Sequence, residues 1–177
     1  MKEQHILIFS HGQTVAQLNK VFSDANTVMT DQGRQEVLND IKDVKSSDVK
    51  YKKIYCSGLP RAIDTAKILS KELAVPFEII QELAQQDFGI YTGTPNTKEN
   101  YENYIKDLLA ENGKCESITS VLNNLKIAVN KISKTNENSI VVAHRFTWLG
   151  FEIYFNNTAY NPGLLTRDEK KVFVRNI

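Results

Sequence analysis

Short apolar segments that alternate with longer segments of helical periodicity are the feature that most constrains the fold of this chain. Apolar segments with the length of buried strands occupy residues 5–9, 53–56, 77–80, 139–143 and 171–175. Helical patterns occupy residues 30–44, 59–73, 99–111, 117–134 and 146–155. This alternation favours an α/β fold, here a three-layer α/β/α sandwich with a mostly parallel central sheet. Because no linker or internal repeat interrupts the pattern, we expect one domain over residues 1–177.

Residues at the boundaries support the predicted helices. Thr30 is a suitable N-cap for the first of them, and Pro60 occupies a first-turn position where proline is tolerated. Gly113 separates the third predicted helix from the fourth. Residues 81–98 are predicted to form a loop, since glycine and proline punctuate this segment.

Polar residues follow three of the predicted strands at the point where each strand ends. These polar segments are residues 10–14, 57–61 and 144–145. Ligands of open α/β sheets bind beyond the carboxyl ends of the strands. We therefore expect the three segments to meet around one crevice.

The chemistry of these segments suits an anion. Gly12 would let the backbone approach a ligand closely, and Thr14 adds a hydroxyl to the same turn. Arg61 lies in the first turn of its predicted helix, so its guanidinium and the helix dipole would face the same charge. His11 and His144 are suited to act as a nucleophile, a proton carrier or a phosphate ligand.

Five segments along the chain resemble, in order, the motifs of the histidine phosphatase (phosphoglycerate mutase-like) superfamily. They are Ser-His-Gly-Gln-Thr at 10–14, Thr-Asp-Gln-Gly-Arg-Gln at 30–35, Ser-Gly-Leu-Pro-Arg-Ala-Ile-Asp-Thr-Ala at 57–66, Glu-Leu-Ala-Gln-Gln-Asp-Phe-Gly at 82–89 and Val-Val-Ala-His at 141–144. One such motif would be weak support, whereas five in family order are specific. The chain is identified as a divergent member of this superfamily.

The resemblance implies a two-step phosphoryl transfer on a small phosphorylated molecule, without a cofactor or a metal. His11 would accept the phosphoryl group, and water or a second substrate would then discharge the phosphohistidine. Arg61 and His144 would hold the equatorial oxygens, where transition-state charge accumulates. The implied catalytic residues are His11, Arg61, Gln85 and His144. The implied phosphate-binding residues are Ser10, Gly12, Thr14, Ser57 and Arg145.

Two positions depart from the family pattern. Ser10 stands where the family has an arginine beside the nucleophile, and a hydroxyl supplies neither charge nor a bidentate fork. Loss of one guanidinium would weaken transition-state binding by about 3 kcal/mol, or about a hundredfold in rate. Gln85 stands where the family has its glutamate proton donor, and such acid catalysis is worth about 10²–10⁴-fold. Together these losses predict a slow enzyme, or one restricted to good leaving groups.

Neighbouring residues offer replacements for both losses. Arg145 stands where the family usually has a glycine, and its guanidinium could occupy the place vacated at Ser10. On its sequence position alone, however, the plainer interpretation is that Arg145 faces solvent. Asp87 and Glu82 lie close in sequence to Gln85 and could supply the missing acid.

Plainer interpretations exist for other residues too. Arg61 could be a surface ion-pair partner, and Ser57 could simply cap its helix. The aromatic residues downstream of residue 90 could line a substrate cap or pack between helices, and we favour packing. These aromatic residues are Tyr91, Tyr101, Tyr104, Phe151, Tyr154, Phe155 and Tyr160.

Composition argues against several other classes of partner. The net charge is +1, from 22 basic and 21 acidic residues, so the chain has no overall electrostatic footprint for nucleic acid or membrane. Two cysteines without a CxxC spacing, and a start that lacks the pattern of a signal peptide, predict a reduced, cytoplasmic protein. The sequence defines no oligomeric state.

Three functions fit this pattern. The retained nucleophile and its cationic partners favour a phosphomonoester hydrolase. The changes at Ser10 and Gln85 favour a pseudophosphatase that binds a phosphorylated ligand or partner without turnover. A mutase is least favoured, because residues 93–117 leave little room for the inserts that enclose a sugar-acid phosphate.

Overall fold

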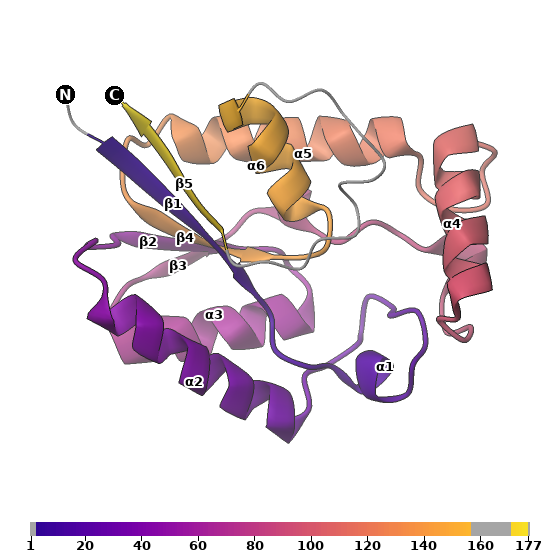
Figure 1. Cartoon of the computed structure of the whole chain (residues 1–177), viewed down its shortest axis with the longest axis horizontal. Coiled ribbons are helices and arrows are strands. Elements are labelled where there is room, and N and C mark those ends of the chain that lie inside the picture. Colours follow the sequence, from indigo (N-terminus) through magenta and orange to yellow (C-terminus); the bar gives the residue numbers. More distant parts are fainter. Residues whose placement is uncertain (1–2, 157–170, 177) are drawn as a thin grey trace.

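The computed structural model describes residues 3–156 and 171–176, and Figure 1 shows the course of the chain. Its strands are β1 (Glu3–Ser10), β2 (Lys53–Cys56), β3 (Phe77–Ile79), β4 (Ser139–Ala143) and β5 (Lys171–Asn176). Its helices are α1 (Val15–Leu18), α2 (Asp31–Ser46), α3 (Pro60–Leu73), α4 (Lys98–Ala110), α5 (Ile118–Ser133) and α6 (Thr147–Asn156). The 3₁₀ turns η1 (Gln81–Leu83) and η2 (Gly89–Tyr91) lie between β3 and α4.

The strands form one sheet in the order β3-β2-β4-β1-β5. Strands β1 to β4 run parallel, and β5 pairs antiparallel with β1 at one edge, so the mostly parallel sheet is confirmed. Ser10 of β1 pairs with Ala143 of β4. Because these two residues end their strands side by side, His11 and His144 leave the sheet from neighbouring positions.

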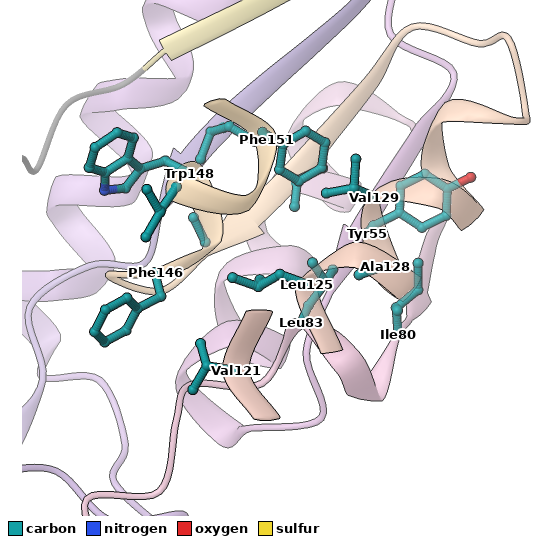
Figure 2. Packing of buried hydrophobic residues seen from close by; sticks show 14 of the residues in the cluster. Tyr55, Ile80, Leu83, Val121, Leu125, Ala128, Val129, Phe146, Trp148 and Phe151 are labelled. Carbon is teal, nitrogen blue, oxygen red and sulfur yellow. The ribbon is translucent and has the colours of Figure 1, made fainter. Parts of the chain in front are cut away.

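Helices cover both faces of the sheet, which confirms the three-layer sandwich. Helices α2 and α3 lie on one face, and α5 and α6 lie on the other (Figure 1). Alternate side chains of β1 enter the two cores, as the period of a strand requires. Phe9 belongs to the same buried cluster as Leu69 of α3, whereas Ile8 belongs to the cluster that contains Leu125 and Phe151 (Figure 2).

Capping residues set the boundaries of the long helices. The Thr30 hydroxyl accepts a hydrogen bond from the N–H of Gly33 at 3.0 Å, which confirms the predicted N-cap of α2. Ser117 caps α5 in the same way, and Pro60 is the first residue of α3. All of the predicted strands and long helices are found, with ends within two residues of the predicted ones.

The short helical elements differ from the prediction. Helix α1 is a single turn, capped by Thr14, whose hydroxyl accepts from the N–H of Gln17 at 3.3 Å. The Gln17 side-chain oxygen in turn accepts from the N–H of Thr14 at 2.8 Å. Residues 81–98, predicted as a loop, contain η1 and η2. Elements this short carry no apolar periodicity, so the sequence pattern did not reveal them.

Two glycines bring the start of α2 against the loop that follows β1. A Cβ atom on Gly12 would lie 2.0 Å from the carbonyl oxygen of Gly33. A Cβ atom on Gly33 would lie 2.1 Å from the carbonyl oxygen of Gln13. Neither position has room for a side chain, so the backbone contact itself fixes the loop that carries His11.

Some of the aromatic residues considered above are buried in the core, and others are not. Tyr104 and Phe151 are 0% exposed, which confirms the packing interpretation for these two. Tyr160 lies outside the described residues. Within the part of the chain that the structure describes, no helix is both long and apolar enough to cross a lipid bilayer.

Candidate active site

A cavity of about 390 Å³ lies at the carboxyl ends of β1 and β4. It is lined by residues from each of the three polar segments, namely Ser10, His11, Thr14, Arg61, His144 and Arg145, and by Gln85. The convergence predicted from the sequence is therefore confirmed. We call His11, Arg61 and His144 the nucleophile end of this cavity.

His11 is half-buried, and its ring is held by the loop that carries it. Its Nδ1 atom lies 2.9 Å from the carbonyl oxygen of Gly12. A carbonyl oxygen only accepts, so Nδ1 donates in this contact. The ring centroids of His11 and His144 lie 5.4 Å apart, with 52° between the ring planes. The arrangement holds the two imidazoles next to each other in the cavity.

His144 is buried, with 4% of its surface exposed. Its backbone N–H donates to the Thr147 hydroxyl at 3.0 Å, and its Nε2 atom lies 2.7 Å from the Ser57 hydroxyl. Burial lowers the pKa of His144 well below its usual value, and the nearby His11 and Arg61 lower the pKa further. The imidazole is therefore neutral at pH 7. Its Nδ1 atom is buried and has no hydrogen-bond partner among the described residues.

Arg61 lies in the first turn of α3, as predicted, and is only 2% exposed. Its Nη1 donates to the carbonyl oxygen of Asp24 at 3.1 Å, and its Nη2 donates to the side-chain oxygen of Gln85 at 2.7 Å. Burial lowers the pKa of Arg61 to about 10, so the guanidinium is charged at neutral pH. These acceptors are uncharged, and the nearby Asp24 carboxylate opposes part of the lowering of the Arg61 pKa. The interpretation of Arg61 as a surface ion-pair residue is wrong.

Both departures from the family pattern lie in the cavity. Ser10 lines the cavity and is exposed. Gln85 also lines it, and its side-chain oxygen accepts from Arg61 and, at 3.5 Å, from the Ser23 hydroxyl. The two replaced side chains thus face the space in which a phosphate would bind.

Arg145 lines the cavity and is half-buried, so the expectation that it faces solvent is wrong. Its guanidinium carbon lies 4.8 Å from the centroid of the Tyr101 ring, a cation–π contact. The contact holds a second guanidinium beside the nucleophile end, on the side of the cavity that α4 forms.

The two candidate replacement acids differ in position. Asp87 is exposed and lines an adjoining cavity of about 220 Å³, which shares Arg61 and Gln85 with the larger one. Glu82 lines neither cavity, and its carboxylate accepts from Lys131 at 2.7 Å. That hydrogen bond lowers the pKa of Glu82. Glu82 is therefore committed elsewhere, whereas Asp87 lies near the site.

Three predicted phosphate-binding residues have other contacts. The space beside Gly12 is filled by Gly33, so the close approach that its lack of a side chain permits is to backbone rather than to a ligand. Thr14 lines the cavity, but its hydroxyl caps α1. Ser57 is fully buried behind His144 and does not line the cavity. Nor is Ser57 the N-cap of α3, a position held by Leu59.

Sequence reasoning missed an aromatic wall, which consists of Phe22, Phe88, Tyr101 and Trp148. Packing was the favoured interpretation for Tyr101, and Tyr101 does pack against the core, but it also lines the cavity. The Phe-Gly pair at 88–89 belongs to a recognised motif and was the available signal for Phe88. Phe22 and Trp148 lie near motifs but outside them.

The cavity also contains a carboxylate that sequence reasoning missed. Asp40 of α2 lines it. Asp40 follows Gly33 by seven residues, which is about 10 Å along a helix axis, so it stands away from the loop of His11. Among the described residues, no group of three or more His, Cys, Asp and Glu side chains is arranged to hold a metal ion.

The sequence profile of the histidine phosphatase superfamily (branch 1) matches residues 6–149 of the chain. The match covers most of the chain and spans the whole nucleophile end described above. The chain therefore belongs to the histidine phosphatase superfamily. No protein with a curated description matches the sequence.

Solved structures share the fold at low sequence identity. A phosphoglycerate mutase from Bacillus anthracis has a TM-score of 0.77 at 18% identity, over 98% of this chain and 88% of that one. The alpha-ribazole phosphatase from Shigella flexneri has a TM-score of 0.71 at 21% identity, over 86% and 79% of the two chains. A mycobacterial glucosyl-3-phosphoglycerate phosphatase has a TM-score of 0.73 at 15% identity, over 89% and 82%. These likenesses establish a phosphoglycerate mutase-like fold.

Proposed function

We propose that this protein is a phosphomonoester hydrolase that works through a phosphohistidine on His11. The observation that carries the proposal is the nucleophile end. It joins an imidazole that is held through its Nδ1 atom, a charged buried guanidinium and a neutral buried imidazole in one cavity. The names of two structural relatives, which are phosphatases, agree with this class of reaction.

In the first step, Nε2 of His11 attacks the phosphorus of the bound ester in line with the leaving oxygen. The new N–P bond forms as the P–O bond breaks, and the leaving oxygen takes the electron pair. Arg61 and His144 line the same cavity, and in this mechanism they stabilise the charge on the equatorial oxygens. The hydrogen bond from His11 Nδ1 to Gly12 supports the positive charge that develops on the ring.

In the second step, water attacks the phosphorus of the phosphohistidine. The N–P bond breaks, its electron pair returns to Nε2 of His11, and inorganic phosphate leaves. A side chain that accepts the water proton would speed this step. Gln85 has no carboxylate for that task, so discharge of the phosphohistidine is expected to be slow.

The substitutions in the cavity predict weakened rather than abolished turnover. Ser10 offers one hydroxyl where the family has a guanidinium, and Arg145, which lines the same cavity, is the candidate replacement for that charge. Asp87, at the adjoining cavity, is the better placed of the two candidate acids. The alternative function is a pseudophosphatase, and the same amide at Gln85 is the observation that favours it.

Hydrolysis of p-nitrophenyl phosphate tests the proposal, because its leaving group needs no acid. We expect slow turnover that His11→Ala lowers by at least about 10³-fold. We also expect the protein to take up acid-labile phosphoryl groups, and His11→Ala to abolish that uptake. His5→Ala is the matched control, since His5 lies at the start of β1 beside Glu3 and away from the cavity.

The pseudophosphatase predicts a different result. The wild-type protein would bind inorganic phosphate, measured by calorimetry, but would not hydrolyse p-nitrophenyl phosphate above the rate of His11→Ala. That outcome would exclude the hydrolase and leave the binding function.

A further inference from the structure

We infer that the substrates of this protein are aryl phosphomonoesters, in which the phosphate is attached to a phenolic oxygen, rather than alkyl phosphates. The inference rests on the proposed hydrolase function. It joins two independent observations, which are the aromatic wall of the cavity and the chemistry of the position that faces the leaving group.

The aromatic wall is a packed unit rather than a set of scattered side chains. The ring centroids of Phe22 and Phe88 lie 5.0 Å apart, with an edge-to-face geometry. Tyr104, which is fully buried, packs behind them at 5.8 Å from Phe22 and 6.0 Å from Tyr101. Ring pairs at these separations attract one another, so the wall presents a fixed apolar surface to the cavity.

The wall adjoins the nucleophile end. Arg145 directly follows His144 in the sequence, and its guanidinium stacks on Tyr101 of the wall. The residue next to the proposed phosphate-binding imidazole therefore contacts the wall. Trp148, in the first turn of α6, also lines the cavity. A ligand whose phosphate meets His144 therefore has aromatic surface within reach of the group that carries the phosphate.

Part of the polar lining of the cavity is already hydrogen-bonded within the protein, although Asn96 and Asp40 also line it. Thr14 and Gln17 line it, but they are bonded to each other through the side-chain oxygen of Gln17. The Ser23 hydroxyl donates to Gln85. A volume of about 390 Å³ lies at the small end of the range for ligand sites, which suits one ring and a phosphate.

The leaving group is limited by Gln85. Its oxygen accepts from Arg61, and its amide group has no proton to give. Glu82 is paired with Lys131. Asp87 lies in the adjoining cavity, where its carboxylate accepts from the N–H of Gly89. Asp40 lines the cavity from α2, seven residues beyond the Gly33 that packs against the loop of His11. A phenol has a pKa of about 10, whereas an alcohol resembles water and is a far weaker acid. A phenolate can thus leave with the electron pair of the P–O bond and take its proton from solvent, but an alkoxide leaves far more slowly.

A series of esters tests the inference on the wild-type protein. Phenyl phosphate, benzyl phosphate and cyclohexyl phosphate have similar size, but only the first releases a phenol. We expect kcat/KM for phenyl phosphate to exceed the other two by at least about 100-fold, and Gln85→Glu to narrow this gap. Cyclohexyl phosphate hydrolysed within about tenfold of phenyl phosphate would overturn the inference.

The role of the wall has its own test. Tyr101→Leu should raise KM for phenyl phosphate by about 2–10-fold, the range expected for a lost aromatic pair, with a smaller change in kcat. Tyr101→Phe keeps the ring and should retain the wild-type KM. Tyr154→Leu removes an exposed tyrosine of α6 outside the cavity and is the control. An unchanged KM in Tyr101→Leu would contradict the role of the wall.

The proposed function and this inference fail in different ways. Without His11-dependent hydrolysis of p-nitrophenyl phosphate, the hydrolase itself is excluded. If that hydrolysis occurs but alkyl esters react as well as aryl esters, the hydrolase stands and the assignment of aryl substrates falls.

Discussion

The nucleophile end differs from the segment that holds Gln85 and Asp87 in two ways. The two regions lie on different kinds of element, and only the nucleophile end keeps the residue types of the family motifs. His11 and His144 follow adjacent parallel strands, and Arg61 lies in the first turn of a helix, all in buried or half-buried places. Gln85 and Asp87 lie on a loop between two 3₁₀ turns. In the proposed mechanism, acceptance of the phosphoryl group and transfer of a proton would thus be carried by different parts of the fold. The residues of one part can change while those of the other are kept.

The largest expected effect is at the nucleophile end. Arg61→Ala should lower kcat/KM for p-nitrophenyl phosphate by about 10²–10³-fold, because a buried charge on the equatorial oxygens is lost. Arg61→Lys should recover part of the rate, since it restores the charge without the fork. Arg34→Ala, at a residue of α2 that pairs with Asp64 at 3.3 Å, controls for the change in net charge. A fall in kcat/KM of less than about tenfold in Arg61→Ala would contradict the role given to the nucleophile end.

A smaller effect is expected from the second guanidinium. Arg145→Ala should weaken the inhibition constant of inorganic phosphate by about tenfold, the lower range for a hydrogen bond to a charged group, since Arg145 is half-buried. Inhibition by phosphate in steady-state assays measures this. Unchanged inhibition would mean that Arg145 only packs on Tyr101 and does not replace the arginine that is missing at position 10.

The smallest effect concerns stability and pH. The pKa of folded His144 is depressed, so the unfolded chain takes up a proton below about pH 6.5 while the folded chain does not. The free energy of unfolding should therefore fall as pH falls from 6.5 to 5.5, by at most about 1.4 kcal/mol from this group. Urea unfolding at the two pH values measures the change, and His144→Asn should flatten it. The same slope in His144→Asn would show that another group is responsible.

Sequence reasoning located the nucleophile end well, because each of its residues belongs to a motif and follows a predictable element. Thr30 and Pro60 marked helix starts through local chemistry that does not depend on the rest of the fold. The parallel sheet followed from the alternation of strands and helices. These features are local, or repeat along the chain, so a single sequence reveals them.

The contacts of particular side chains were harder to predict. Ser57 was assigned to phosphate, but its hydroxyl lies 2.7 Å from His144, 87 residues away in sequence. Arg145 was expected in solvent because nothing in its own segment indicates Tyr101 of α4 as a partner. Such contacts depend on the spatial order of elements, which the sequence pattern does not specify. Phe22 and Phe88 escaped notice for the same reason.

The contact of Gly12 with Gly33 gives the site an unusual tolerance to change. Backbone atoms of the loop and of α2 meet without any intervening side chain, and neither the residue at 10 nor the one at 85 takes part in this contact. Those two residues can be exchanged, or exchanged back, without rebuilding the scaffold around them. The chemistry of this protein is therefore open to evolution one side chain at a time, while the two glycines themselves admit no substitution.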